Sequence, residues 1–428
     1  MSAAVTDRAA RRIAVVGAGP AGSTTAIRLA GLGYRPVIIE KAEFPREHIG
    51  ESLTGEAGVL LRELGLGDFM AERGFPVKRG VRVFGKTGQA EFWVPVQAVD
   101  DTGQIIEGET WQVRRPELDA RLLQAACDAG AGRILAEARE VLREGDRVTG
   151  LRLRHADGRV EDMATDMVVD ASGMSTFLSR MGVCGRRQRG GYDKQAAFYA
   201  QFTGMRRDPG ALGDNTMIFY SGRNRWAWCI PISETVTSIG VVVPGGEYKA
   251  AGLTPAEFMK ARLADLHPLV AERTTAVEQV SPAWTASNFS YEIEGFAGPG
   301  YICVGDAHQF TDPIFSFGVS NAMQEAFRAA PVIDACLQSD AGHCAELMGA
   351  YMRELSEGQS RIRDMIDTFW SHPLAFLKIA HADYRHELAE LFSGRIYGDR
   401  PGRLHALQQM QRMARIGRGD PDDLAASA

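Results

Sequence analysis

A glycine-rich turn near the start of the chain constrains the fold more than any other feature. Residues 12–17 are expected to form a short buried strand, and the sequence GAGPAG at 17–22 follows it directly. A helix is expected at 21–32 and a second strand at 35–40. This β-α-β pattern implies parallel strands joined by a right-handed crossover. The chain is therefore predicted to begin with a dinucleotide-binding fold.

Each glycine of this turn has its own expected role around a pyrophosphate. Gly17 makes the tight turn, Gly19 lets backbone N–H groups approach the phosphates, and Gly22 permits close packing of helix on strand. The helix N-terminus adds a partial positive charge. Glu40 ends the second strand, where a carboxylate can accept hydrogen bonds from ribose hydroxyls. The nucleotide-binding residues expected in this unit are Gly17, Ala18, Gly19, Ala21, Gly22 and Glu40.

Length, charge and cysteine content limit the classes of partner. The chain has 428 residues, enough for two or three domains, and a formal net charge of -6 without a long basic run. Binding to nucleic acid or to an anionic membrane is not favoured, and no apolar stretch is long enough for a membrane span. Six scattered cysteines without a C-x-x-C pair indicate reduced thiols rather than disulfides or a metal cluster. Because the first twelve residues lack the apolar core of a signal peptide, we expect a cytoplasmic protein with no metal site.

The remaining sequence predicts more strands and then helices. Hairpins are expected around turns at 86–88 and 157–158, with the second hairpin's return strand at 159–169. Residues 195–243 are expected to form an antiparallel sheet, and 255–272 a helix. The predicted fold class is α/β plus antiparallel β, with a discontinuous Rossmann-like domain, a β-sheet substrate domain and a helical C-terminal region. The boundaries expected for these are 1–75, 107–185 and 290–335 for the first, 76–106 and 186–289 for the second, and 336–428 for the third.

Three segments identify the nucleotide by resemblance. Arg115-Pro116-Glu117-Leu118-Asp119, the sequence VVDASG at 168–173, and the pair Gly305-Asp306 resemble signatures of flavoproteins similar to p-hydroxybenzoate hydroxylase. In that superfamily the Gly-Asp pair holds the ribityl chain of FAD and the arginine lies near the FAD, which implies these roles for Asp306 and Arg115. No second G-x-G-x-x-G appears, so a separate nicotinamide-binding fold is not expected. The Rossmann-like domain is therefore predicted to bind FAD.

Three further strings resemble those of flavin-dependent halogenases. WAWCIP at 226–231 matches W-x-W-x-I-P, and FTDPIFSFG at 310–318 matches F-x-x-P-x-x-S-x-G. The segment around Arg46 and Ser52 (FPREHIGESL) also looks like this family, which implies that both residues contact the cofactor. The resemblance covers roughly residues 12–335. Tryptophan halogenases are longer and carry Glu where this chain has Phe315, so the phenol and pyrrole branch is the better match.

The resemblance implies a reaction, its cofactors and its partners. A partner flavin reductase supplies FADH2, and the flavin C4a-hydroperoxide formed with O2 oxidises chloride or bromide to hypohalous acid. The acid travels to a lysine, which hydrogen-bonds it or forms a haloamine. An electron-rich phenol or pyrrole of secondary metabolism, free or bound to an acyl or peptidyl carrier protein, then takes the halogen.

The resemblance also assigns roles to individual residues. Lys78 is the expected relay lysine and Lys86 its rival, although Lys86 lies in a predicted solvated turn. Trp226 and Trp228 would form an apolar wall that keeps the substrate from the flavin, and Ser316 belongs to the same catalytic set. The backbone of Phe317 and Gly318, at a helix start, would line the halide site, and Gly318 would also approach the flavin ring.

Simpler interpretations of these residues remain open at the level of sequence. Two tryptophans alternating on a strand share a face and could be plain core, and most lysines are surface residues. His308 could carry protons, although a hydrogen-bonded loop residue is favoured. The same FAD signatures also occur in aromatic monooxygenases, in reductases of the geranylgeranyl type and in non-catalytic proteins. W-x-W-x-I-P argues against the first two, and the intact glycines and Asp306 argue against the third.

Overall fold

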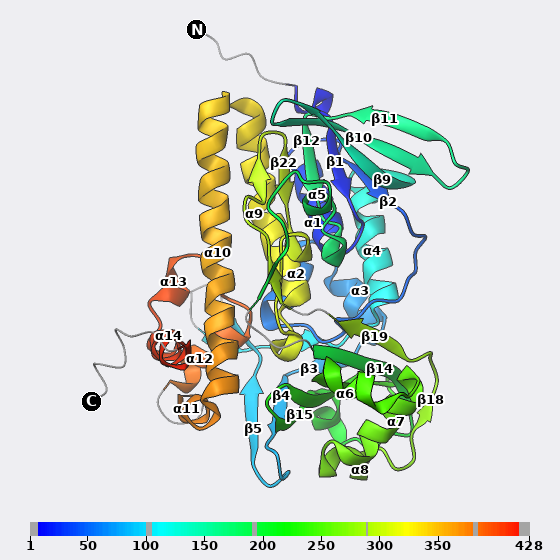
Figure 1. The fold of residues 1–428 in the computed structure, drawn as a ribbon, viewed down its shortest axis with the longest axis vertical. Helices are drawn as coiled ribbons and strands as arrows, with labels where there is room; N and C mark the ends of the chain where they lie inside the picture. The colour runs from blue at the N-terminus through cyan, green and yellow to red at the C-terminus, as the bar shows by residue number, and fades with distance from the viewer. Residues whose placement is uncertain (1–6, 100–104, 191–194, 288–289, 380–383, 419–428) are drawn as a thin grey trace.

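An eight-stranded sheet forms the upper half of the molecule in Figure 1. The computed structural model describes residues 7–99, 105–190, 195–287, 290–379 and 384–418. Some parts of the predicted domains lie outside these ranges, namely residues 1–6, 100–104, 191–194, 288–289, 380–383 and 419–428. In order across the sheet, the strands are β11 (Val160–Ala164), β10 (Arg147–His155), β9 (Gly132–Glu144), β2 (Val37–Glu40), β1 (Ile13–Val16), β12 (Met167–Asp170), β22 (Tyr301–Cys303) and β21 (Ala297–Gly298).

The centre of this sheet is the predicted dinucleotide-binding unit. β1 pairs in parallel with β2 and with β12, and β12 pairs in parallel with β22. All four residues of β1 are buried, as expected for a strand with both faces covered. Helix α1 (Pro20–Gly31) packs against α9 (Gly318–Gln338) and α4 (Arg115–Asp128). The α/β part of the predicted fold class is therefore confirmed.

A second large sheet forms the lower half of the molecule, and its strands are mostly antiparallel. Its side chains alternate between two faces: Trp226, Trp228 and Ile230 belong to the core shared with the upper sheet, whereas Ala227 and Cys229 face the opposite side. In order, the strands are β18 (Glu278–Gln279), β14 (Gln195–Thr203), β17 (Thr237–Pro244), β16 (Arg225–Pro231), β15 (Thr216–Gly222), β4 (Gly80–Phe84) and β5 (Glu91–Pro95), with β19 (Trp284–Ser287) also paired to β14.

Two expected elements are each divided in the structure. The helix expected at 255–272 is two helices, α7 (Pro255–Asp265) and α8 (Pro268–Arg273). Pro268 starts the second helix, and the N–H of Leu269 donates to the His267 side chain. The strand expected at 159–169 is also divided into two strands. β11 returns antiparallel to β10, and the chain then turns into β12, which joins the parallel centre beside β1.

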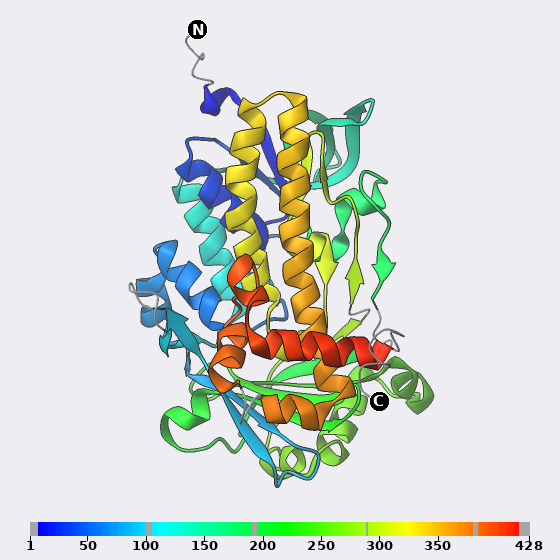
Figure 2. The ribbon, with the colours of Figure 1, turned by 90° about the vertical axis from the view of Figure 1, so that its left-hand side faces the viewer.

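The C-terminal part is helical, as predicted. The long helix α10 (Ala341–Ser371) runs beside α9, and α14 (His405–Arg418) crosses below them in Figure 2. Between these lie the short helices α11 (Pro373–Lys378), α12 (Arg385–Phe392) and α13 (Asp399–Gly402). These helices bring Phe369 and Phe392 to the lower sheet, where both residues line a cavity described below.

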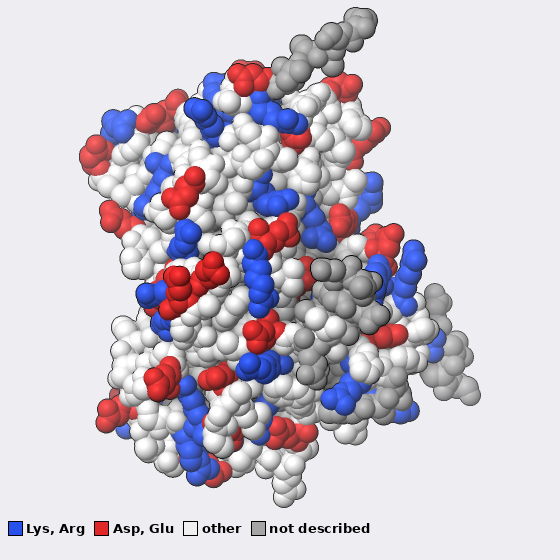
Figure 3. All heavy atoms as spheres, turned by 180° about the vertical axis from the view of Figure 1, so that it is seen from behind, with Lys and Arg blue, Asp and Glu red and all other residues white. Residues whose placement is uncertain are grey.

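The surface carries charges of both signs. On the face seen in Figure 3, lysines and arginines are interspersed with aspartates and glutamates. Within the described part of the chain, no helix combines the length and the apolar character needed to cross a lipid bilayer.

Candidate functional site

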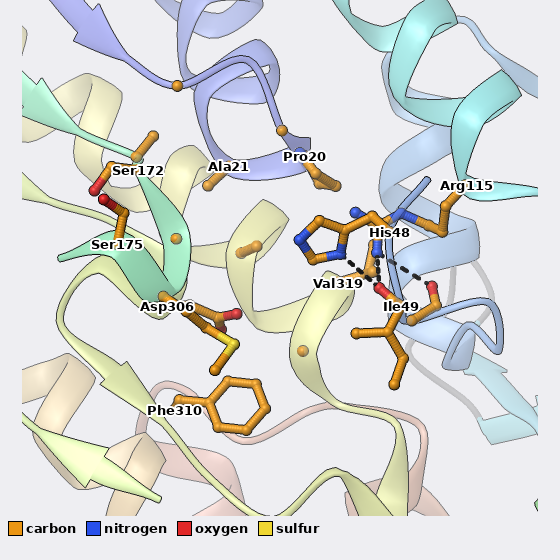
Figure 4. Close-up of a pocket in the computed structure, with 18 of the residues that line it drawn as sticks. Pro20, Ala21, His48, Ile49, Arg115, Ser172, Ser175, Asp306, Phe310 and Val319 are labelled. Carbon is orange, nitrogen blue, oxygen red and sulfur yellow. Dashed lines mark hydrogen bonds between the residues drawn. The ribbon is translucent and has the colours of Figure 1, made fainter. Parts of the chain in front are cut away.

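A cavity of about 490 Å³ extends from the glycine turn of the upper sheet to the tryptophans of the lower sheet. In Figure 4, His48 and Arg115 lie on one side of it, and Ser172, Ser175 and Asp306 lie on the other. The cavity thus joins all the segments from which the sequence predicted FAD contacts. It is long, and its polar and charged groups lie mostly toward the upper sheet, with an apolar end at the lower sheet.

The glycine turn is shaped to leave room for a ligand. Gly17 has φ +103°, and a Cβ there would lie 2.4 Å from the carbonyl oxygen of Ala171. A Cβ on Gly22 would lie 1.9 Å from the carbonyl oxygen of Gly17, so Gly22 allows the helix to pack onto the turn. Gly17, Gly19 and Ala21 line the cavity, whereas Ala18 and Gly22 lie behind it. The residues present therefore fit the pyrophosphate of a dinucleotide.

Glu40 holds the turn as well as lining the cavity. Its Oε2 accepts a hydrogen bond of 2.9 Å from the backbone N–H of Ala18, and its Oε1 accepts one of 2.9 Å from Ala42. The carboxylate is buried at the end of β2, where a ribose would lie. The remaining lone pairs can accept hydrogen bonds from a ribose, so the predicted role and this structural role are compatible.

Arg115 is fixed at the cavity wall by a buried ion pair. Its guanidinium donates two hydrogen bonds to Asp119, at 2.8 and 3.0 Å, and further ones to the carbonyls of Ile49 and Gly50. Arg46 also lines the cavity and packs against Phe44. Arg115 therefore anchors the segment 46–52 to helix α4, and both arginines offer positive charge to an anionic cofactor.

His48 is a cavity residue that the sequence did not single out. Its Nδ1 donates a 2.8 Å hydrogen bond to the carbonyl of Ile49, which leaves Nε2 as an acceptor. Burial, together with the charge of Arg115, lowers the pKa of His48 to about 4, so its ring is neutral at pH 7. The string FPREHIGESL contained this residue, and only its position on the cavity wall shows that it can contact a ligand.

Asp306 lies at the cavity wall, as expected for a contact with the ribityl chain. Burial raises the pKa of this carboxyl to about 7, with a further contribution from Glu325. The loop is held by Tyr291, whose hydroxyl donates to the Asp306 carbonyl at 2.6 Å. His308 points away from the cavity and lies 2.9 Å from Glu325, which agrees with the favoured interpretation of a hydrogen-bonded loop residue.

Trp226 and Trp228 form the end wall of the cavity at the lower sheet. They are 2% and 4% exposed, and their ring centroids are 5.6 Å apart. The indole N–H of Trp228 lies 3.4 Å from Ser238 Oγ, whereas that of Trp226 has no partner among the described residues. The two rings thus belong to the core and also line the cavity.

Gly240 makes room for the ring of Trp228. The two residues are opposite each other on β16 and β17, and a Cβ on Gly240 would lie 2.1 Å from the indole. We therefore expect Gly240→Ala to displace Trp228 and to lower product formation by about tenfold or more, the scale expected for misplacing a group near the chemistry. FAD affinity should stay within about threefold, because the glycine turn is untouched. Product assays, FAD titration and tryptophan fluorescence check this, and normal turnover with unchanged fluorescence would contradict it.

The loop before α9 separates two cavities. Asp312 accepts a hydrogen bond from the N–H of Ile314 at 3.1 Å and starts a tight turn, after which Ser316 has φ +60°. Ser316 and Ile218 line both the large cavity and a second one. Gly318 also lines the large cavity at the start of α9, whereas the side chain of Phe317 is buried in the core. A halide contact from Phe317 could therefore come only from its backbone, as predicted.

Lys78 lies in the second cavity, which measures about 40 Å³. Its side chain is 2% exposed, and its Nζ donates hydrogen bonds to Ser52 Oγ at 2.8 Å and to the carbonyl of Leu53 at 2.7 Å. Burial lowers the pKa of Lys78 to about 7. The rival Lys86 is exposed in the turn between β4 and β5. Lys78 is thus the buried amine of this pair.

The walls of the second cavity come from parts of the chain that no motif connects. They include residues of β4 and β5, the loop before α9, and the helices α10 and α12. Apart from Lys78, Thr54 and Ser316, the lining side chains are apolar. They are Val81, Val83, Phe92, Val94, Pro95, Val96, Ile218, Ile314, Phe315, Phe369 and Phe392.

Comparisons with known proteins agree with this geometry. Residues 11–364 match the FAD binding domain family. A 1H-pyrrole-2-carbonyl-[peptidyl-carrier protein] brominase of Pseudoalteromonas luteoviolacea is 37% identical over 89% of this chain and 91% of its own length. The corresponding chlorinase of Pseudomonas fluorescens is 29% identical over 96% and 95%. The solved structure of a flavin-dependent brominase superposes with a TM-score of 0.87 at 34% identity, covering 97% of this chain and 99% of that one.

Proposed function

Because the chain belongs to the flavin-dependent halogenases, which carry the FAD binding domain, we propose that it halogenates a pyrrole-2-carbonyl group attached to a peptidyl carrier protein. The substrates named for the two relatives support the pyrrole and its carrier. The observation that carries the proposal is the pair of cavities that share Ser316 and Ile218. One fits FAD, and the other holds a buried amine within apolar walls.

The large cavity offers groups for each part of FAD. Gly17, Gly19 and the start of α1 would hold the pyrophosphate, Glu40 a ribose, and Asp306 the ribityl chain. Trp226 and Trp228 would enclose the apolar end. Bound in its reduced form, FAD would give two electrons to O2, and the chloride or bromide ion would give the other two as it is oxidised. The tryptophan wall would exclude water and the organic substrate from this end of the cavity.

The second cavity would bring the substrate ring to Lys78. A neutral amine donates two hydrogen bonds, here to Ser52 and Leu53, and keeps its lone pair for an electrophilic halogen. Because the pKa of Lys78 is about 7, its neutral fraction increases as pH rises through that value. We therefore expect single-turnover halogenation to accelerate from pH 6 to pH 7.5. A rate that falls over this range would instead favour the ammonium form as a hydrogen-bond donor.

Two partners complete the proposal. A separate flavin reductase would supply reduced FAD, since the sequence contains only one dinucleotide-binding motif. The carrier protein would deliver the pyrrole on its phosphopantetheine arm. We also propose a cytoplasmic location, because none of the six cysteines forms a disulfide.

The carrier dependence has a direct test. The enzyme would be incubated with a flavin reductase, NADH, FAD, O2 and bromide or chloride, and with either pyrrole-2-carbonyl carrier protein or free pyrrole-2-carboxylic acid. We expect mass spectrometry to show halogen on the carrier-bound pyrrole and little on the free acid. Equal halogenation of the free acid would rule out the carrier as a required partner, and halogenation of only a free phenol would reassign the substrate class.

A further inference from the structure

Glu51 is a buried carboxyl on the wall of the large cavity, and the proposed reaction has so far given it no role. Its side chain is 2% exposed, and its Oε2 has no hydrogen-bond partner among the described residues. It lines the cavity beside Ser52, and thus stands where the segment 46–52 passes from the FAD side to the Lys78 side. A buried carboxyl with an unpartnered oxygen is destabilising, most of all when it is ionised, unless a ligand supplies the missing partner.

The lower sheet and helix α4 both face Glu51. Ser238 of β17, Gln201 of β14 and the charge of Arg115 favour its ionised form. Burial opposes ionisation and dominates, so that the pKa of Glu51 is raised to about 8. Glu51 therefore carries a proton at neutral pH even though a guanidinium is near.

Two other titratable groups act on the same position. Glu47, which is half-buried in the same segment, adds negative charge that also opposes ionisation of Glu51. Tyr199 of β14 lies beside these carboxyls, and its pKa is raised above its ordinary value by burial and then by Glu51 and Glu47. Tyr199 is thus neutral throughout the range in which Glu51 titrates.

Glu51 also belongs to the end of the cavity that the tryptophans close. Ser238 faces Glu51, and its Oγ lies 3.4 Å from the indole nitrogen of Trp228. The carboxyl is therefore close to the wall where the oxidation of halide would occur.

Halogenation consumes one proton, which is needed at the end of the cavity that the tryptophans close. An aromatic C–H, a halide ion, O2 and reduced flavin give an aromatic C–halogen bond, oxidised flavin and two molecules of water. The halide and the flavin each lose two electrons, and O2 gains four. Of the four hydrogens in the two waters, two come from neutral reduced flavin and one from the ring. The fourth is a proton that must be supplied to the closed cavity.

We propose that the Glu51 carboxyl holds this fourth proton inside the FAD cavity and delivers it during halogenation. The inference rests on the proposed function, since only a reaction that consumes a proton here gives Glu51 this task. It explains why a carboxyl with an unpartnered oxygen stands beside the tryptophan wall. It also makes Glu51 a residue that contacts the reacting groups, distinct from Lys78 in the second cavity.

The test compares Glu51→Gln, Glu51→Asp and the control Glu43→Gln, which changes an exposed glutamate shortly before the segment 46–52. In the FAD-loaded enzyme without halide or substrate, the midpoint potential of the wild type and of E43Q should show an inflection with pH near 8. E51Q should lack this inflection, and E51D should keep one. Halogenation by E51Q at pH 7 should be about 10²–10⁴-fold slower, the range for loss of a positioned proton donor.

A measurement without flavin covers the case in which E51Q no longer binds FAD. The unfolded chain releases the Glu51 proton near pH 4.5, whereas the folded chain keeps it to about pH 8. The wild type is therefore destabilised progressively from pH 4.5 to pH 8, and the Tm of E51Q relative to wild type should rise over this interval. E43Q should show no such trend.

Several results would overturn the inference. These are an inflection that persists in E51Q, a Tm difference that is constant with pH, or halogenation by E51Q at the wild-type rate. A wild type that shows the inflection but never halogenates any substrate would overturn the proposed function and leave Glu51 as a protonated wall residue only.

Discussion

Lys78→Met is expected to abolish halogenation while leaving FAD bound. The amine is the basic group among the lining residues of the second cavity, and methionine fills the same space without a nitrogen. Removing a positioned catalytic group typically slows a reaction by about 10²–10⁴-fold, so product should fall near or below detection. FAD affinity should change by less than about threefold, because the glycine turn, Glu40 and Asp306 are unaltered. Mass spectrometry of the product and titration with FAD measure both effects.

The same variant should be more stable than the wild type at neutral pH. Burial lowers the pKa of Lys78 from 10.5 to about 7, which means that folding disfavours the charged amine. This penalty is complete below pH 7 and disappears as pH rises toward 10.5, where the unfolded lysine also loses its proton. After allowance for two lost hydrogen bonds, we expect K78M to raise the free energy of unfolding by about 2 kcal/mol at pH 6–7.

Controls separate the role of the amine from simple packing. Lys78→Arg should not restore activity, because a guanidinium stays charged and offers no lone pair to an electrophilic halogen. Lys86→Met, in the exposed turn, should retain wild-type turnover. A K78M enzyme that halogenates normally would show that Lys78 is structural, and loss of activity in K86M would transfer the role to that residue.

Gly22→Ala is expected to remove FAD binding. The added Cβ would lie 1.9 Å from the carbonyl oxygen of Gly17, a backbone atom that cannot move without opening the turn. Gly17 is itself held against Ala171, so the strain cannot be relieved by a side-chain rotation. We expect FAD affinity to fall by more than about 100-fold and the free energy of unfolding to fall by about 3 kcal/mol. Fluorescence titration with FAD and chemical denaturation measure the two changes.

Gly31→Ala is the matched control, at the other end of the same helix. A Cβ there would meet no atom within 4 Å, and alanine favours helix more than glycine does. This variant should bind FAD normally and should be as stable as the wild type or more stable, by up to about 0.5–1 kcal/mol. Normal FAD binding by G22A would show that the turn is not the pyrophosphate site.

Much of the upper sheet could be predicted from local sequence. The run of buried residues in β1, the glycine turn and the terminal Glu40 lie within 28 residues, so near-neighbour rules define the unit. The strand β12, which continues the parallel centre, was harder to predict. It follows β11 after only a short turn, and the pattern of hydrophobic residues runs through both strands. Only pairing with β1 distinguishes the two strands.

The site was predicted in part, for a similar reason. Motifs placed Trp226, Trp228 and Asp306, and the family resemblance placed Lys78. The structure brings the tryptophans and Asp306 to one cavity and Lys78 to its neighbour. The walls of the second cavity come from α10, α12 and two strands distant in sequence. No local sequence pattern predicts that these elements pack together. Glu51 was present in a motif, but its importance depends on burial and on a missing partner, which only the packed structure supplies.

The substrate is expected to be oxidised only through a halide, which the flavin and O2 together oxidise first. This expectation is tested most directly by the mass of the carrier-bound pyrrole after turnover with and without bromide, in otherwise identical reactions with the reductase, NADH and O2. We expect a product with the isotope doublet of bromine when bromide is present, and unchanged substrate when it is absent. A product heavier by one oxygen in the absence of halide would contradict it and identify the enzyme as a hydroxylase.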